Sequence, residues 1–315
     1  MSVIWKISLV CLSLFVFTDN ASSLGDWPEY NWRTSSPEAQ GMSSAKLRAI
    51  SPAAIGNAVV IRNGYEVWTW GDPARRYSNW ASVTRSYLTT AWGMAIQDGS
   101  IAGGLNILEQ PVRNLASATA KRFSADVRLK HLLSYTSCRR PAGSRWSYSC
   151  GQDWFDQYRI FKELTGRSVH DYLNKVLFPV LGGQTLIATP TDSDRGETSR
   201  VAGSARDHAR WGYLWLNQGY WKNSKLLDPS FVARSIHPGP DGHGPNINEG
   251  WQIHLSTDGS VVPGCPSDVY FAYGDVDRAV VFGSPSLNLV VARWNSNHDY
   301  PIEAWMGQIC QAAHT

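Results

Sequence analysis

The spacing of apolar residues predicts two strands near the start of the chain, followed by a long helix. Residues 57–62 and 65–70 are rich in β-branched and aromatic side chains, and Asn63-Gly64 between them is a strong turn signal. In residues 82–98 the apolar positions recur at helical spacing, and a glycine follows as a stop signal. The sequence therefore predicts a β-hairpin and then a helix. The apolar face of that helix carries Leu88, Ala91, Trp92 and Ala95.

The rest of the pattern places further strands after a helical middle. Residues 100–240 contain amphipathic pieces separated by loops, which is typical of helices. Four later runs are short, rich in β-branched and aromatic residues, and separated by Gly, Pro and Asp. These runs are residues 251–255, 269–273, 279–282 and 289–294, and a final helix is expected over residues 302–313.

These elements predict one economical packing. The early hairpin and the late strands join in a single antiparallel sheet, the last helix covers one face, and the helical middle forms a second lobe. We therefore expect a sheet lobe made of residues 24–80 and 245–315, and a helical lobe made of residues 81–244. Because pockets are common at such seams, a site is expected between the lobes.

The first residues have the pattern of a signal peptide. Lys6 supplies a positive charge, residues 7–17 form an apolar run, and small residues follow at positions 21–23. The run is shorter than the roughly 20 residues that a membrane-spanning helix needs. The prediction is a cleaved signal over residues 1–23. The mature chain, residues 24–315, would lie in the periplasm or outside the cell without a stable membrane span. An uncleaved membrane anchor is the alternative.

Four cysteines remain after the signal, and their number favours disulfides. They are Cys138, Cys150, Cys265 and Cys310. An even number in an exported chain is typical of a disulfide framework, although four cysteines allow three pairings. We favour Cys138 with Cys150 and Cys265 with Cys310, because each pair falls within one stretch of the expected fold. Four free buried thiols are the alternative.

Composition excludes several classes of function. Of the 315 residues, 43% are hydrophobic and 17% charged, which is ordinary for a folded chain and excludes a disordered one. The net charge of +3 is mild and no block of like charges occurs, so nucleic acid is not an expected partner. The histidines lack metal-ligand spacing, so neither a metal nor another cofactor is expected. The histidines considered are His131, His208, His243, His254 and His298.

The segment with the most chemical potential is residues 81–86, at the start of the predicted helix. Ser82 and Arg85 are three residues apart, so both project from one face. The positive end of the helix dipole favours negative charge that develops on the Ser82 hydroxyl, but serine is a poor nucleophile until a neighbour takes its proton. Taken alone, such a serine is more simply explained as a helix N-cap.

Two later segments add candidate groups. Tyr148 lies in a Ser-rich segment, where nearby cations would make a tyrosine a general base; a buried tyrosine with a bonded hydroxyl is the alternative. Tyr273-Gly274-Asp275 ends a predicted strand, and the glycine would let a substrate lie against the strand edge. The backbone N–H after Gly274 and that of Ser82 would together form an oxyanion hole.

These three pieces, in this order, resemble the motifs of the β-lactamase-related serine hydrolases. This family includes class C β-lactamases, penicillin-binding proteins such as D-alanyl-D-alanine carboxypeptidases, related esterases and 6-aminohexanoate-dimer hydrolases. Other segments are also similar to the family, so the resemblance covers about residues 35–312. These segments are residues 129–137, 165–181, 203–231 and 280–293.

The resemblance implies an α+β fold like that of serine β-lactamases and penicillin-binding proteins, with an antiparallel sheet flanked by helices and a mostly helical lobe. It implies that Ser82 is the acyl-forming nucleophile, Tyr148 the phenolic base and Gly274 the glycine of the substrate-binding strand. Ser82 and Asp275 would give the oxyanion-hole N–H groups. The implied reaction is acyl transfer from a small ester or amide to Ser82, followed by hydrolysis of the acyl-enzyme.

The first departure from the family pattern is Arg85, which stands where the family has lysine. Because arginine stays protonated, it cannot receive the serine proton. It would instead hold Tyr148 as a phenolate by its charge, leaving that tyrosine to take the proton alone.

Two further departures bear on the substrate. Cys150 replaces an asparagine whose amide orients acyl amide groups, which argues against peptide or β-lactam turnover. Ala272 and Tyr273 stand where the third motif has a cation, which argues against carboxylate-bearing substrates such as penicillins unless Arg278 or Arg293 substitutes.

Two functions are therefore kept. The favoured one is a serine hydrolase for small esters or amides with weak or no β-lactamase activity. The alternative is a catalytically impaired relative that keeps the fold and binds a ligand or a cell-wall fragment. The two functions differ in whether catalysis is possible with Arg85 in place of lysine, since the expected fold is common to both.

Overall fold

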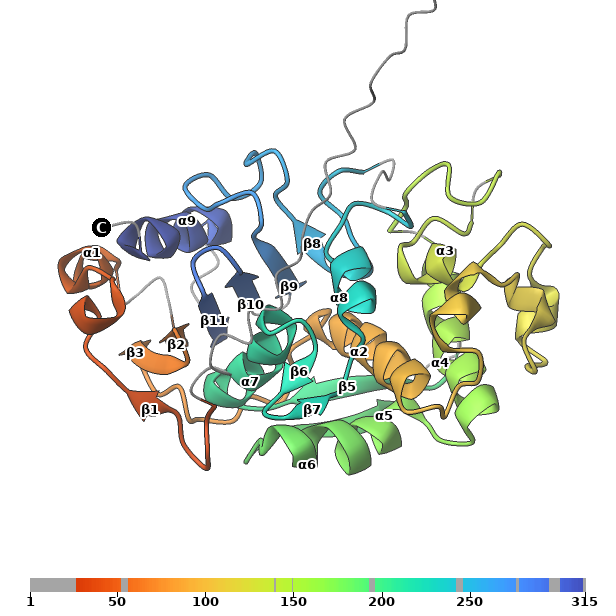
Figure 1. Cartoon of the computed structure of the whole chain (residues 1–315), viewed down its shortest axis with the longest axis horizontal. Helices are drawn as coiled ribbons and strands as arrows, with labels where there is room; N and C mark the ends of the chain where they lie inside the picture. The colour runs from red at the N-terminus through yellow and green to blue at the C-terminus, as the bar shows by residue number, and fades with distance from the viewer. Residues whose placement is uncertain are drawn as a thin grey trace, which may run out of the picture.

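A computed structural model of the chain shows a sheet with helices on both faces and a mostly helical region beside it (Figure 1). The predicted signal peptide, His243 and His298 lie outside the described residues. The structure describes residues 27–51, 56–138, 140–148, 150–192, 196–241, 246–275, 278–294 and 301–313.

The sheet joins strands from both ends of the described chain. In spatial order these strands are β1 (Arg33–Thr34), β3 (Tyr65–Trp70), β2 (Asn57–Arg62), β11 (Leu289–Trp294), β10 (Ala279–Ser284), β9 (Tyr270–Gly274) and β8 (His254–Leu255). The predicted hairpin is β2–β3, and β2 pairs with β11, so the hairpin and the late strands share one sheet as predicted.

The pairing differs from the prediction at one edge. β1 runs parallel to β3, whereas the other neighbours in the sheet are antiparallel. The expectation of a purely antiparallel sheet was therefore wrong. A strand of two residues is too short to show the alternation that predicts strands, so the sequence gives no signal for β1.

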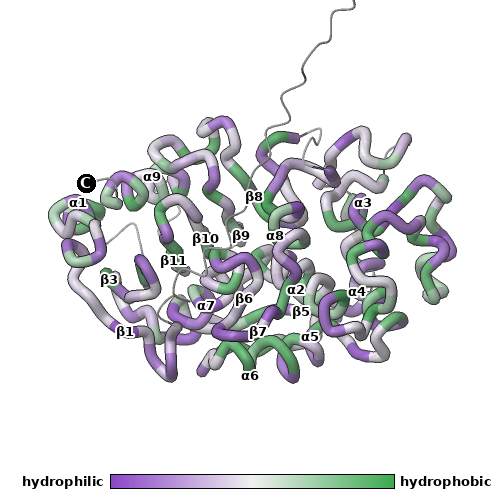
Figure 2. Tube along the Cα trace, in the orientation of Figure 1, coloured by the Kyte–Doolittle hydropathy of each residue, from purple (hydrophilic) through white to green (hydrophobic). Residues whose placement is uncertain are grey.

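The central strands divide their side chains between two apolar cores. Val291 of β11 belongs to the core formed with α1 (Ser44–Ala49) and α9 (Ile302–Ala313), whereas its neighbour Val290 belongs to the core that includes α7 (Ala205–Leu216). This follows from the two-residue period of a strand. Every residue of β10 and β11 is buried, and Figure 2 shows hydrophobic residues along both strands.

The helix α7 lies within residues 81–244 yet packs on β11, β10 and β2 of the sheet. Its approach is close, since a Cβ on Gly212 would lie 2.7 Å from a methyl carbon of Val290. The other helices are α2 (Val83–Gln97), α3 (Leu129–Leu133), α4 (Gly151–Thr165), α5 (Val169–Tyr172), α6 (Phe178–Leu181) and α8 (Pro229–Ser235). Short 3₁₀ turns span Glu38–Gln40, Gly104–Glu109, Val112–Asn114 and Ala120–Arg122, and a π-helical turn spans Leu173–Leu177.

The middle of the chain also holds two small antiparallel sheets, the first of which the sequence analysis did not predict. One pairs β4 (Ile187–Thr191) with β5 (Thr198–Ala202), and the other pairs β6 (Tyr220–Trp221) with β7 (Ser224–Lys225). β4 contains Pro190, a residue that weakens a strand prediction because it cannot donate to the ladder. β5 matters for the site, because it fixes the chain just before α2.

The helix α2 lies between the two parts of the fold. It contacts β9 and β10 of the large sheet on one side, and α4, α5 and β5 on the other. The four residues predicted to form its buried face are all buried, which confirms the prediction. They are Leu88, Ala91, Trp92 and Ala95. Burial on all sides fixes its axis, so the first turn of α2 lies at the seam where a site was expected.

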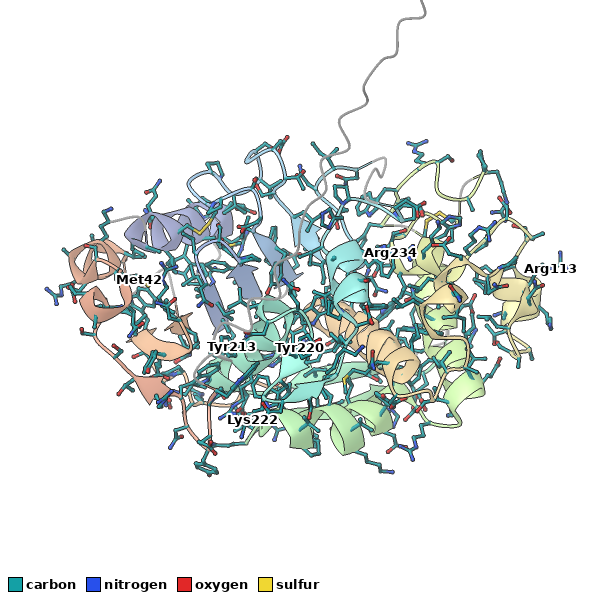
Figure 3. All side chains as sticks on the ribbon, viewed as in Figure 1. Met42, Arg113, Tyr213, Tyr220, Lys222 and Arg234 are labelled. Carbon is teal, nitrogen blue, oxygen red and sulfur yellow. A yellow bond between two sulfur atoms is a disulfide. The ribbon has the colours of Figure 1, made fainter. Side chains whose placement is uncertain are left out.

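Two disulfides join Cys138 to Cys150 and Cys265 to Cys310, which confirms the favoured pairing. Figure 3 shows one near α3 and the other beside α9. The first closes the segment that carries Tyr148, and the second ties α9 to the segment before β9. Within the described residues, no helix combines the length and hydropathy needed to cross a membrane.

Candidate active site

Ser82 stands at the N-cap of α2, but its hydroxyl does not cap the helix. Its Oγ lies 3.2 Å from the phenol oxygen of Tyr148, within hydrogen-bond reach for a site without bound substrate. Ala81, directly before it, has a φ of 46°, a left-handed conformation that costs energy for a residue with a Cβ and that clusters at functional sites. The N-cap explanation therefore does not account for the position of the Ser82 hydroxyl.

The chain before Ser82 is anchored to β5. The Trp80 backbone N–H donates to the carbonyl of Val201 at 3.3 Å, and its indole N–H donates to the carbonyl of Gly203 at 3.0 Å. Trp80 is wholly buried. These bonds hold the backbone directly before the strained residue Ala81. They thereby help to set the direction in which the Ser82 side chain points.

Tyr148 comes from the loop that precedes α4. The Ser147 backbone N–H donates to the carbonyl of Tyr135 at 3.0 Å, and the disulfide from Cys138 to Cys150 closes the same loop. The position where the family pattern has an amide is thus occupied by a covalent cross-link at the N-cap of α4. Tyr148 is 46% exposed, so its ring forms part of the wall of an open cleft.

Arg85 is enclosed by aromatic rings. Its guanidinium carbon lies 4.2 Å from the ring centroid of Tyr148, 4.8 Å from that of Trp154 and 5.7 Å from that of Tyr135. One guanidinium nitrogen donates to the Tyr135 hydroxyl at 3.1 Å. The cation therefore faces the ring of Tyr148, and its hydrogen bond goes to a different phenol.

That second phenol begins a buried chain of polar groups. Burial raises the pKa of Tyr135 far above its ordinary value, although Arg85 opposes the rise, so Tyr135 stays a neutral phenol. Its hydroxyl donates to Gln252 Oε1 at 3.2 Å, and the Gln252 amide donates to Gln157 Oε1 at 2.7 Å. The Gln252 backbone carbonyl also accepts from the Ser86 hydroxyl at 2.7 Å. These bonds hold α2, α4 and the segment before β8 in one register.

The third motif lies beside the nucleophile. A Cβ on Gly274 would lie 2.4 Å from the Trp80 carbonyl oxygen, so only glycine lets the end of β9 approach the chain before Ser82 this closely. The sequence analysis assigned this glycine to substrate contact, and the structure shows that it packs against the protein's own backbone. Among the described residues, neither the Ser82 nor the Asp275 backbone N–H donates a hydrogen bond, and the Asp275 carboxylate accepts from the Tyr273 hydroxyl at 3.0 Å.

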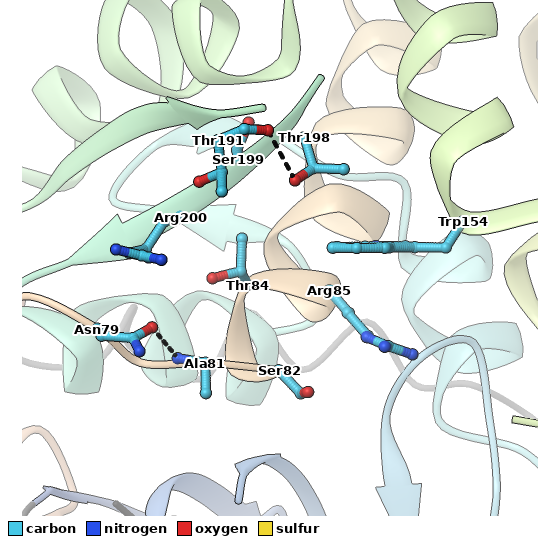
Figure 4. A pocket seen from close by; sticks show the side chains of 10 residues that line it. All are labelled: Asn79, Ala81, Ser82, Thr84, Arg85, Trp154, Thr191, Thr198, Ser199 and Arg200. Carbon is cyan, nitrogen blue, oxygen red and sulfur yellow. Dashed lines mark hydrogen bonds between the residues drawn. The ribbon is translucent and has the colours of Figure 1, made fainter. Parts of the chain in front are cut away.

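Ser82 and Arg85 separate two hollows. The larger, of about 210 Å³, lies between the start of α2, Trp154 of α4 and the β4–β5 hairpin (Figure 4). The smaller, of about 20 Å³, is also lined by Tyr148 and by residues of β8 and β9. Ser82 is therefore accessible from a space large enough for an acyl group and from one that fits about one water molecule.

The structure also places the cations that were considered for substrate binding. Arg293 is wholly buried on β11, with its guanidinium carbon 4.4 Å from the ring centroid of Trp305, so it does not face either hollow. Arg278 lines neither hollow. Arg200 of β5 is exposed and lines the larger one together with Ser82 (Figure 4). In the part of the chain that the structure describes, no three His, Cys, Asp or Glu side chains gather as metal ligands.

Sequence reasoning missed several residues of this site. Trp154 and Tyr135 enclose Arg85, and Glu249 and His254 line the smaller hollow together with Tyr273. Glu249 and His254 are five residues apart and form an antiparallel bridge across a short turn. In the sequence, a separation of five residues with Gly250 between them is compatible with a tight turn. Such a turn would have brought the two side chains together.

Comparisons with solved structures identify the fold. A Bacillus anthracis protein assigned as a 6-aminohexanoate-dimer hydrolase is similar with a TM-score of 0.67 and 14% identity, over 92% of this chain and 89% of that one. A β-lactamase from Mycobacterium bovis is similar with a TM-score of 0.63 and 16% identity, over 86% and 97%. EstCE1, a hydrolase with promiscuous acyltransferase activity, has a TM-score of 0.60 and 14% identity, over 88% and 98%.

No protein-family model matches the sequence, and no curated protein matches it. The structural likeness covers most of each chain at low identity, so it defines the arrangement of strands and helices. The predicted fold class is thereby confirmed, apart from the parallel edge strand. The chain has the α+β fold of the serine β-lactamases and penicillin-binding proteins.

Proposed function

We propose that this protein is a serine hydrolase that acts through an acyl-enzyme on small esters or amides, with weak or no β-lactamase activity. The observation that carries the proposal is the 3.2 Å contact between Ser82 Oγ and the Tyr148 hydroxyl at the start of a buried helix. In this scheme Ser82 Oγ attacks the acyl carbon while its proton passes to Tyr148, which then protonates the leaving group.

Two features support this assignment of roles. Tyr148 must accept the serine proton as a phenolate, and the Arg85 cation beside its ring supplies the positive charge that offsets the charge on that oxygen. The Ser82 and Asp275 N–H groups would bind the oxyanion, since Gly274 lets β9 end next to the nucleophile.

The substrate class follows from the cleft. An amide that would orient an acyl amide group is replaced by the Cys138–Cys150 cross-link, which disfavours peptides and β-lactams. The larger hollow, of about 210 Å³, suits a short acyl chain beside Trp154. The two disulfides support an exported protein, in the periplasm or outside the cell, because disulfides persist in oxidising compartments.

The test is covalent labelling of the full chain with a fluorophosphonate, read by intact mass. We expect one phosphonyl adduct on the wild type and none on Ser82→Ala. Ser43→Ala is the matched control, because Ser43 is also a helix N-cap serine but lies on α1 and bonds the Lys46 backbone N–H. Turnover of short 4-nitrophenyl esters, with little turnover of a chromogenic cephalosporin, is expected in parallel. An unlabelled wild type would refute the proposal.

The alternative of an impaired, ligand-binding relative is favoured by one observation. Arg85 cannot take a proton, and its hydrogen bond goes to Tyr135 and not to Tyr148. Under the favoured proposal, Arg85→Lys keeps or raises ester turnover, because lysine restores a group able to accept the proton. If the wild type turns over no ester and Arg85→Lys does, the hypothesis of a catalytically impaired relative is correct.

A further inference from the structure

The smaller hollow beside Ser82 contains a histidine that the scheme above does not use. His254 of β8 lines it together with Tyr148, Tyr273 and Glu249. Arg85, also in the wall, is a permanent cation. His254 is the group in this wall whose ring carries one nitrogen that donates a proton and one that accepts it, which makes it a candidate base.

Glu249 fixes the orientation of this histidine. The two residues form an antiparallel bridge across a short turn, closed by a bond from the Gly250 N–H to the Ile253 carbonyl at 2.9 Å. His254 Nδ1 lies 2.7 Å from Glu249 Oε1, and the Glu249 side chain is only 12% exposed. A carboxylate accepts the proton of Nδ1, which leaves Nε2 with its lone pair free to accept another.

The surroundings hold the ring in one place. The imidazole stacks on the ring of Phe271 at 5.1 Å between centroids, and Phe271 pairs with His254 across β8 and β9. The turn between Glu249 and His254 contains Gln252 with φ of 58°, whose side chain joins the buried polar chain that leads to Arg85. Such a strained residue, held by several bonds, is typical of functional sites.

The size of the hollow indicates what the histidine acts on. About 20 Å³ beside Ser82 and Tyr148 is room for a single water molecule with several polar partners. An acyl group on Ser82 would extend into the larger hollow, which Ser82 also lines. The water site and the acyl site are therefore two separate hollows that both reach Ser82.

We infer that His254, oriented by Glu249, is the general base that activates the hydrolytic water. This inference rests on the proposed function. The water oxygen bonds to the acyl carbon as its proton moves to His254 Nε2, and Glu249 stabilises the imidazolium. The bond from the acyl carbon to Ser82 Oγ then breaks. Tyr148, which is left as a phenolate once it has protonated the leaving group, takes the proton of the imidazolium and passes it to Oγ, 3.2 Å away. The pair thus supplies a base for deacylation that Arg85, which stays protonated, cannot be.

The test separates formation of the acyl-enzyme from its hydrolysis. With 4-nitrophenyl butyrate, His254→Gln should release a burst of one nitrophenol per chain and then turn over about 10²- to 10⁴-fold more slowly than the wild type. Intact mass should show the butyryl adduct accumulating on the variant. Fluorophosphonate labelling of Ser82, which needs no deacylation, should change by less than a few fold.

Two more variants guard against a purely structural role. Glu249→Gln keeps a hydrogen-bond acceptor for Nδ1 but removes the charge, so it should give a smaller loss of kcat and a smaller adduct. His237→Gln is the matched control, because His237 is exposed after α8 and lines neither hollow. The decline of wild-type kcat toward acid pH should be absent in His254→Gln. The other titratable or charged side chains that line this hollow with His254 are Glu249, Tyr148, Tyr135, Tyr273 and Arg85, and all are unchanged in the variant.

Two results would overturn the inference. One is His254→Gln with wild-type turnover and no accumulating adduct. The other is a joint loss of labelling, turnover and thermal stability, which means that the pair only holds the turn. An unlabelled Ser82 in the wild type is a separate result, because it removes the proposed function itself.

Discussion

Substituting Gly274 with alanine tests whether β9 sets the position of the nucleophile. The new Cβ would lie 2.4 Å from the Trp80 carbonyl oxygen and 3.1 Å from the Ala81 Cβ. Real Cβ contacts stay beyond 3.0 Å, so the Trp80 carbonyl must retreat by at least 0.6 Å. Trp80 is two residues before Ser82 and is held by β5. A displacement of its carbonyl therefore also displaces the backbone that carries the Ser82 side chain.

The expected effect of Gly274→Ala follows from that displacement. Overpacking of a buried contact costs about 1–3 kcal/mol of the free energy of unfolding. Misplacing a reacting group by the better part of an ångström costs up to about 10²-fold in rate. We therefore expect the fluorophosphonate labelling rate of Ser82 to fall by about 10- to 100-fold, measured on protein that is still folded by circular dichroism.

Gly212→Ala is the matched control for this experiment. It also overpacks a buried contact, since its Cβ would lie 2.7 Å and 2.9 Å from methyl carbons of Val290 and Val281. That contact lies between α7 and the sheet, away from Ser82, so a similar loss of stability should leave the labelling rate within about threefold. Equal loss of labelling in both variants, or none in Gly274→Ala, would show that β9 does not position the nucleophile.

The remaining predictions concern the disulfides and a buried histidine. Replacing Cys138 and Cys150 together by alanine should cost about 3 kcal/mol by the loop-entropy relation and slow Ser82 labelling, because Tyr148 loses its tether. Replacing Cys265 and Cys310, which are 45 residues apart, should cost about 4 kcal/mol by the same relation but leave labelling of the folded protein unchanged. Chemical denaturation and intact mass measure both effects, and labelling lost equally in both double variants would contradict the tether. Burial lowers the pKa of His208 well below 6.5, so the unfolded chain binds a proton that the folded chain does not. Stability should therefore be full above about pH 6.5 and fall as the pH drops, by up to about 1.4 kcal/mol per pH unit. His208→Asn should flatten that slope in urea melts at pH 5 to 8, and an unchanged slope would refute the assignment.

Local patterns were enough to predict the elements whose signals are local. The hairpin over residues 57–70 and the helix over residues 302–313 are found as predicted, because turn chemistry and apolar periodicity act within a few residues. β1 and the β4–β5 hairpin were missed. The two residues of β1 form a strand only because β3, about 30 residues later, presents its backbone to them. The β4–β5 hairpin is local, but Pro190 in β4 hides the strand signal.

The residues of the site also fall into a predicted group and a group that was missed. Ser82, Arg85 and Tyr148 were predicted by their order and context along the chain, and the structure brings all three together. Tyr135 and His254 were not, since their closeness to Arg85 and Ser82 depends on packing between segments 50 or more residues apart. Nothing local distinguishes a tyrosine or histidine that will face a cleft from one that will face solvent.

The ends of the large sheet have a consequence for the protein's behaviour in crowded surroundings. Both edges are strands of two residues, β1 (Arg33–Thr34) and β8 (His254–Leu255). Long exposed edges are templates for pairing with another chain, and edges this short offer few unpaired backbone groups. The strand that carries His254 can therefore stay open to a cleft, where a longer strand would invite self-association and bury the histidine against a second molecule.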